Sequence, residues 1–95
     1  MRRKIPATQA LLCFEAAARH ESFTRAAQEL SLTQSAISRQ ITTLEELVGM
    51  ALFRRTRHGV ALTSAGTRYA SQVASWLRGL EQDTLDLMST RGHGG

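Results

Sequence analysis

The chain has 95 residues, 42% of them hydrophobic, which is enough for one small domain with a compact core plus an appendage. Its single cysteine, Cys13, excludes an internal disulfide and is expected to be a packed thiol, while His20, His58 and His93 lie too far apart in the sequence for a local metal motif. The sequence has no recognisable signal peptide and no apolar run long enough to span a bilayer, so we expect a cytoplasmic, nucleoid-associated protein with no membrane partner. No metal or cofactor is expected either.

The net charge is +4, and its distribution along the chain is uneven. The whole basic excess lies before Ser64, and no acidic residue occurs between Glu46 and Glu81. A basic face opposed by few acids suits a phosphate-bearing partner such as nucleic acid. For so modest an excess, an ordinary solvated surface is the alternative.

Two short helices are predicted in the first third of the chain. The first covers about residues 7–19, where Leu11, Phe14 and Ala18 recur at helical spacing after Pro6. The second follows Ser22, a suitable N-cap, and its apolar residues fall at i, i+3, i+4 and i+7. These residues are Phe23, Ala26, Ala27 and Leu30.

The third predicted helix, about residues 33–48, has two contrasting faces. Thr33 is its expected N-cap and Gly49 ends it. Ile37, Ile41, Leu44 and Val48 form one narrow apolar stripe. The opposite side carries Ser35, Ser38, Arg39 and Thr42, with Gln34 at its margin, and Glu45 and Glu46 continue it one turn later. Because these two acids would repel phosphates, we expect only the N-terminal half of this face to approach DNA, where the helix dipole is positive.

A basic hairpin is predicted next. Phe53 begins one short strand, and Val60 and Leu62 alternate in a second. Gly59 provides the turn conformation that other residues resist. Such a ribbon is marginal alone and must pack on the helices. Its first strand carries Arg54 and Arg55, and its tip carries Arg57 and His58.

The last predicted helix starts after Thr63, a suitable N-cap, and continues to about Met88. A helix of about 25 residues is about 38 Å long, more than the rest of this domain could cover. We therefore expect a partner chain, and the alternative is a terminal helix folded back on its own core. The expected dimerisation seam alternates at three and four residues and is widened by Trp76. It comprises Ala70, Val73, Trp76, Leu77, Leu80, Thr84 and Leu87.

This order of elements predicts a mainly α winged helix-turn-helix: a three-helix core, a two-stranded β wing and a long C-terminal linker helix. A helix fits the major groove, where short polar side chains and arginine can read base edges, and a basic loop can grip phosphates. The alternative is a winged-helix protein-interaction or dimerisation module without sequence-specific DNA binding. An enzyme is disfavoured, because the sequence has no identifiable nucleophile with a base, paired carboxylates or phosphate-binding glycine loop.

The stretch SFTRAAQELSLTQSAISRQITTLEELVGMALFRRTRHGVALTSAG resembles the N-terminal domain of LysR-type transcriptional regulators. The resemblance rests on "AA" in the second helix, then "SRQI", "LE", "LF.R" and "LT.AG" in this order, and covers roughly Ile5 to Met88. Ser31 departs from the pattern, since many helix-turn-helix motifs have glycine at this turn position. We divide the chain into a DNA-binding domain (1–63), a linker helix (64–90) and a disordered tail (91–95).

The resemblance implies a dimer, joined through the linker helices, that binds an interrupted palindrome in double-stranded DNA. It implies base contacts from Gln34, Ser35, Ser38 and Arg39, with Arg39 the strongest candidate because it can pair with guanine. It further implies phosphate contacts from Ser22, Thr24 and Thr33, and a wing tip that reaches the minor groove through Arg57 or His58. Full-length relatives continue into an effector-binding domain, so a small-molecule site is expected only in that absent part.

Overall fold

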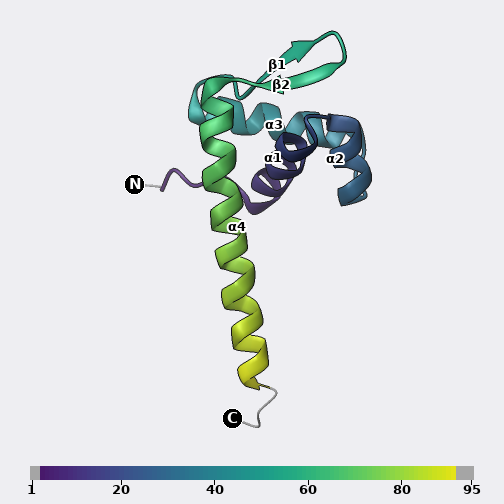
Figure 1. Cartoon of the computed structure of the whole chain (residues 1–95). Helices are drawn as coiled ribbons and strands as arrows, with labels where there is room; N and C mark the ends of the chain where they lie inside the picture. The colour runs from purple at the N-terminus through teal and green to yellow at the C-terminus, as the bar shows by residue number, and fades with distance from the viewer. Residues whose placement is uncertain (1–2, 92–95) are drawn as a thin grey trace.

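The structure, a computed structural model, describes residues 3–91, which form four helices and one two-stranded antiparallel sheet (Figure 1). The elements, in chain order, are α1 (Thr8–His20), α2 (Phe23–Leu30), α3 (Gln34–Val48), β1 (Phe53–Thr56), β2 (Gly59–Leu62) and α4 (Ser64–Arg91). This is the predicted winged helix-turn-helix with a long terminal helix. Arg91, assigned to the tail from the sequence, is instead the last helical residue, and the predicted disorder of residues 92–95 lies outside the described residues, as does His93.

Local hydrogen bonds start the helices where the sequence predicted. The Ser22 hydroxyl accepts the backbone N–H of Arg25 at 3.1 Å, and the Thr33 hydroxyl accepts that of Ala36 at 3.0 Å. Thr63 accepts the N–H of Gly66 at 3.0 Å and so caps α4. Each cap satisfies a backbone donor that the first helical turn leaves without a partner. Gly49 ends α3 in the left-handed conformation, with φ 79°.

The turn between α2 and α3 places Ser31 in the left-handed conformation, at φ 56° and ψ 43°. This is the conformation that glycine adopts without steric cost, because a Cβ atom crowds the following carbonyl oxygen. The backbone N–H of Ser31 still bonds the carbonyls of Ala27 and Gln28, so the α2 C-terminus is satisfied. Ser31 therefore adopts a backbone conformation that glycine would adopt with less strain.

Replacing Ser31 with glycine is expected to raise the free energy of unfolding by about 0.5–1 kcal/mol, since relief of the left-handed strain exceeds the entropy that glycine adds to the unfolded chain. Urea unfolding followed by circular dichroism measures the change as a higher midpoint with an unchanged slope. Ser75→Gly in the exposed interior of α4 is the control and should lower stability by about 0.5 kcal/mol. A loss of stability in Ser31→Gly would contradict the strain.

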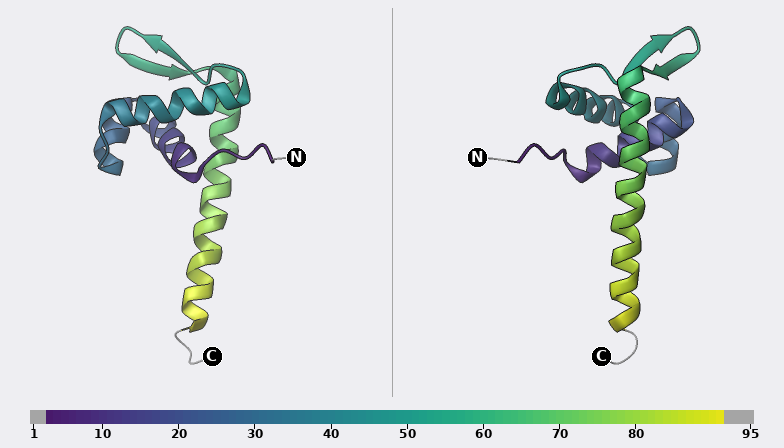
Figure 2. Two further views of the ribbon diagram at one scale, coloured as in Figure 1. Left: turned by 180° about the vertical axis from the view of Figure 1, so that it is seen from behind. Right: turned by 60° about the vertical axis from the view of Figure 1, so that its left-hand side comes forward.

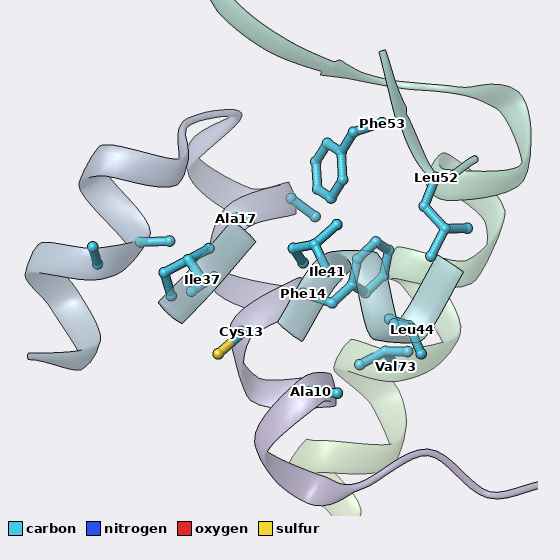
Figure 3. Packing of buried hydrophobic residues seen from close by; sticks show 14 residues of the cluster. Ala10, Cys13, Phe14, Ala17, Ile37, Ile41, Leu44, Leu52, Phe53 and Val73 are labelled. Carbon is cyan, nitrogen blue, oxygen red and sulfur yellow. The ribbon is translucent and has the colours of Figure 1, made fainter. Parts of the chain in front are cut away.

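The core lies where α1 crosses α3, beneath the start of the hairpin and beside α4 (Figures 2 and 3). Phe14 of α1 is fully buried, with its ring centroid 5.6 Å from both that of Phe53 in β1 and that of Tyr69 in α4. The predicted apolar stripe of α3 faces this centre, and Ile37, Ile41 and Leu44 are buried there. Phe23 and Leu30, two residues of the apolar pattern predicted for the second helix, are only partly buried, because α2 lies at the edge of the helical group.

The hairpin pairs Phe53 with Leu62 and Thr56 with Gly59, so that Arg57 and His58 form its two-residue loop. Gly59 adopts φ 142°, the glycine conformation that the sequence predicted. Phe53 attaches the hairpin to the helices: its ring is buried and meets Phe23 edge-on at 5.3 Å. The packing that a two-stranded ribbon needs is therefore supplied by its first residue.

The two halves of α4 have different surroundings: the first packs on the rest of the domain, and the second is largely exposed. Its first half packs on α1 and β2, and Val73 there is 0% exposed, buried in the chain's own core. Val73 was predicted to lie in a dimer seam, but the chain's own core already covers its side chain, which therefore has no exposed surface to offer a partner. Leu77 still packs partly on the core, and past it the helix extends from the body of the domain (Figure 1). Trp76, Leu80 and Leu87 are 51%, 57% and 73% exposed.

Candidate nucleic-acid interface

The polar face of α3 lies on the side of the helix opposite its buried stripe. Gln34, Ser35 and Arg39 are exposed, and so is Thr42 one turn later. Ser38 is half-buried, because it lies toward the hairpin and lines a hollow between α3 and the wing. The predicted base-contacting residues are therefore together on one accessible helix surface, which can offer hydrogen-bond donors and acceptors to a partner.

The hollow beside this face has a volume of about 120 Å³. α3 contributes Ser38, Thr42 and Glu45 to its wall, and the wing contributes Arg54 and Arg55. Figure 2 shows α3 lying between the hairpin and α1, so that the wing overhangs one side of the helix. Side chains from α3 and from the wing thus border a continuous surface.

The hydroxyl-bearing residues near the start of α3 have defined local partners. Thr24 donates its hydroxyl to Oε1 of Gln34 at 3.2 Å, which links α2 to the first residue of α3. Ser22 and Thr33 use their oxygens as N-caps and retain an O–H donor for an external acceptor. The predicted phosphate-contacting residues are therefore gathered around the N-terminal ends of α2 and α3.

The wing provides the strongest concentration of exposed positive charge. Arg54, Arg55, Arg57 and His58 are all exposed. Within residues 3–91 none of them forms an ion pair with an acidic side chain. The charge of the three arginines is consequently available to an anionic partner, and the His58 ring is accessible beside them.

An ion-pair cluster between α1 and α2 was not predicted from the sequence. Arg19 donates to Glu15 at 2.8 Å and to Glu29 at 2.6 Å, and the His20 ring lies 2.7 Å from the other oxygen of Glu29. These hydrogen bonds from Arg19 and His20 lower the pKa of Glu29 to about 2. Only the Glu15–Arg19 spacing of four residues is visible in the sequence. The charge of Arg19 is therefore compensated inside the chain.

Protonation of Glu29 is expected to weaken the domain as the pH falls from about 4.5, the ordinary pKa of the group, to about 2. A carboxylate with a lowered pKa in the folded state stabilises above its unfolded pKa, and this stabilisation is lost through that window. Glu29→Gln should therefore be less stable at pH 7, and its deficit should shrink toward pH 2. Urea unfolding across this pH range measures it. Glu46→Gln, at an exposed acid without an ion pair in residues 3–91, should show no such convergence.

Glu45 has a different role from the one that the helical wheel indicated. The sequence placed Glu45 and Glu46 together as acids that repel a phosphate backbone. Glu46 is exposed, but Oε2 of Glu45 accepts the backbone N–H groups of Leu52 at 2.8 Å and Phe53 at 3.2 Å. The carboxylate is half-buried against the start of β1, so its charge is directed to the backbone rather than to the outer surface.

Three further observations concern other kinds of site. Cys13 is fully buried, and burial raises the pKa of its thiol. Among residues 3–91, no group of three His, Cys, Asp or Glu side chains is placed to hold a metal ion. No helix in the same range is both long and apolar enough to cross a bilayer.

The chain matches the family of bacterial regulatory helix-turn-helix proteins of the lysR type over residues 8–67. It is 42% identical over 94 residues to the glycine cleavage system transcriptional activator of Escherichia coli strain K12, covering 99% of this chain. It covers 31% of that protein, so the chain spans about a third of the length of this relative.

Solved structures of similar fold include complexes of DNA-binding domains with DNA. The BenM DNA-binding domain bound to catB site 1 DNA superposes with a TM-score of 0.81 and 32% identity, over 92% of this chain and 96% of that one. The CbnR DNA-binding domain in complex with DNA gives a TM-score of 0.79 and 27% identity, over 86% and 94% of the two chains. With the family match and the winged helix-turn-helix fold, these findings show that the chain belongs to the lysR family of bacterial regulatory helix-turn-helix proteins.

Proposed function

We propose that this chain is the sequence-specific, double-stranded DNA-binding module of a bacterial transcription regulator. In this proposal α3 enters the major groove and the wing tip, through Arg57 or His58, reaches the adjacent minor groove. Its likeness to two DNA-binding domains in complex with DNA and its membership of a family of regulators support the proposal.

The polar face of α3 is the single observation that carries this function. A helix fits the major groove of B-form DNA, where each base pair presents its own pattern of donors and acceptors. Gln34 and Arg39 offer long hydrogen-bonding groups, while the short side chains of Ser35 and Ser38 allow the helix to approach the bases. The buried stripe on the other side holds the helix rigidly in the domain.

Contacts to the DNA backbone would position this helix. Hydroxyl groups and helix N-termini are suited to phosphates, and the wing arginines add attraction that is independent of sequence. The proposed backbone and minor-groove residues are Ser22, Thr24, Thr33, Thr42, Arg54, Arg55, Arg57 and His58.

Two copies are proposed to pair through the exposed half of α4. Its apolar side chains would be buried by an identical helix, and a two-fold dimer matches an interrupted palindrome. Trp76, Leu80 and Leu87 are the proposed centre of this contact, with Thr84 as its polar member. Ala70 and Leu77 lie partly against the chain's own core and would contribute only their remaining exposed surface. The effector site of the regulator is proposed to lie in a further domain, outside these residues.

Arg39→Ala is expected to weaken binding to the cognate duplex by about 1–3 kcal/mol and binding to random DNA by much less, because a bidentate arginine–guanine pair distinguishes bases. Fluorescence anisotropy with the cognate duplex and a scrambled one measures both affinities. The duplex is first obtained by sequencing the fragments that the chain retains from random or genomic DNA.

Arg55→Ala is the matched control for this substitution. If Arg55 contacts phosphate, its loss should weaken both duplexes equally and make the salt dependence shallower by about one unit. An equal loss on both duplexes for Arg39→Ala would reassign that residue to the DNA backbone. If the protein retains no preferred DNA fragment, the result would favour the alternative, a winged-helix interaction module without sequence-specific DNA binding.

A further inference from the structure

The junction between α3 and the wing is held by a side chain of α3 itself. Glu45 lies in the last turn of the helix, and one of its oxygens, Oε2, accepts two consecutive backbone N–H groups. The donors belong to Leu52 and Phe53, the residue before β1 and its first residue. Hydrogen bonds to an ionised carboxylate are stronger than those between neutral groups, and a half-buried carboxylate is screened less by solvent.

The same short segment is held from the side of α4. The backbone N–H of Thr63 donates to the carbonyl of Leu52 at 3.0 Å, and the Thr63 hydroxyl donates to that of Ala51 at 2.9 Å. Leu52 therefore has its N–H bound to α3 and its C=O bound to the residue that caps α4. The start of the wing is fixed between two helices by hydrogen bonds that its own two strands cannot provide.

This tie matters because the hairpin is otherwise weakly supported. Its pairing extends over only four residues in each strand, and beyond the buried ring of Phe53 its first strand is exposed. A two-stranded ribbon of this size is marginally stable by itself. Without the carboxylate, the N–H groups of Leu52 and Phe53 would lose their acceptor, and the wing could pivot about the loop that follows Gly49.

We propose that Glu45 is a positioning residue, which fixes the angle of the wing relative to α3 so that both elements reach one duplex together. The inference rests on the proposed function, because it concerns how the two DNA-contacting elements are kept in register. A wing held in place before binding avoids the entropic cost of ordering it on the DNA. The proposal requires an acceptor oxygen at the place where Oε2 of Glu45 lies, and the negative charge only strengthens the two hydrogen bonds.

Two substitutions in the full chain separate geometry from charge. Glu45→Asp keeps the charge but withdraws the carboxylate by about 1.5 Å, one carbon–carbon bond, which takes it beyond hydrogen-bonding distance of both donors. Glu45→Gln removes the charge but retains an oxygen with two lone pairs at the same reach. Both are compared with the unmutated chain at a temperature where circular dichroism shows all three folded.

Amide hydrogen exchange in the free protein is the first measurement. The proposal expects the amides of Leu52 and Phe53 to be protected in the unmutated chain and in Glu45→Gln, and to exchange much faster in Glu45→Asp. Unchanged protection in Glu45→Asp would overturn it. This measurement needs no DNA, so it decides whether Glu45 holds the wing even if the unmutated chain shows no sequence preference and the proposed function fails.

DNA binding to the selected duplex is the second measurement. Glu45→Asp should bind about tenfold more weakly, while Glu45→Gln should stay within about twofold of the unmutated chain. Tighter binding by Glu45→Gln, with a steeper salt dependence, would instead identify Glu45 as a repelling charge and overturn the proposal.

Coupling to the wing tip distinguishes positioning from general destabilisation. Arg57→Ala should weaken the unmutated chain and Glu45→Gln by the same factor, and should have little further effect on Glu45→Asp, whose wing no longer reaches the groove. An equal effect of Arg57→Ala in all three backgrounds would show that Glu45 does not position the wing.

Discussion

Gly66→Ala is expected to destabilise the domain by at least about 3 kcal/mol, a large part of what a chain of this size possesses. Gly66 is buried in the first turn of α4, where a Cβ atom would lie 2.0 Å from the carbonyl oxygen of Leu52 and 2.9 Å from its carbon. These atoms are backbone and cannot move aside as a flexible side chain would. Leu52 is also the residue that Glu45 and Thr63 hold from two sides. Relief of the clash would therefore disturb the start of the wing.

Urea unfolding of the full chain measures this effect, and Gly79→Ala is the matched control. Gly79 lies in the same helix, and beyond its chain neighbours and the adjacent helix backbone a Cβ atom added to it would meet nothing within 4 Å, so alanine there should stabilise the chain by up to about 1 kcal/mol through helix propensity. Opposite signs at two glycines of one helix would show that close approach, and not helix propensity, decides the outcome at Gly66. Equal stability of Gly66→Ala and the unmutated chain would refute the prediction.

Phe14→Ala is expected to cost about 3–5 kcal/mol, because it removes a fully buried aromatic ring and leaves a cavity. The ring is the contact shared by three parts of the fold: it belongs to α1, and it meets Phe53 at the start of the wing and Tyr69 of α4. Its loss should therefore weaken the attachment of both the wing and the linker helix. The free energy of unfolding from urea titration is the measured quantity.

Leu12→Ala, two residues away in α1, provides the control for Phe14→Ala. Leu12 is 39% exposed, so its truncation removes less buried surface and should cost well under half as much. Similar losses for the two variants would indicate that the α1 helix itself, rather than the ring of Phe14, limits stability.

Features that depend on near neighbours in the chain could be predicted from the sequence. The caps formed by Ser22, Thr33 and Thr63 each join residues three apart, so their bonds follow from local spacing. The two faces of α3 follow from the helical period, and the conformation of Gly59 follows from the short hairpin turn. For the same reason, the exposed polar face of α3 that carries the proposed function could be predicted from the sequence alone.

Contacts between distant segments could not be predicted in this way. The helical wheel placed Glu45 on the polar side of α3. It could not reveal that the segment before β1 lies beside Glu45, where the N–H groups of Leu52 and Phe53 donate to its carboxylate. The pairing of Arg19 with Glu29 spans ten residues and two helices. The motif that contains Gly66 was seen in the sequence only as part of a family resemblance. The structure supplies the physical reason for a glycine there, because the backbone of Leu52 lies where a Cβ atom would stand.

The sequence by itself determined the kinds and order of the elements, the helix ends and the polar surface of α3, since periodicity and capping act over a few residues. Only the tertiary structure decided which stretches of one apolar stripe are already covered. In α4 the same pattern buries Val73 in the chain's own core and leaves Leu87 exposed. The physical reason is that hydrophobic periodicity states which face avoids water, while burial depends on which other segment arrives to cover that face.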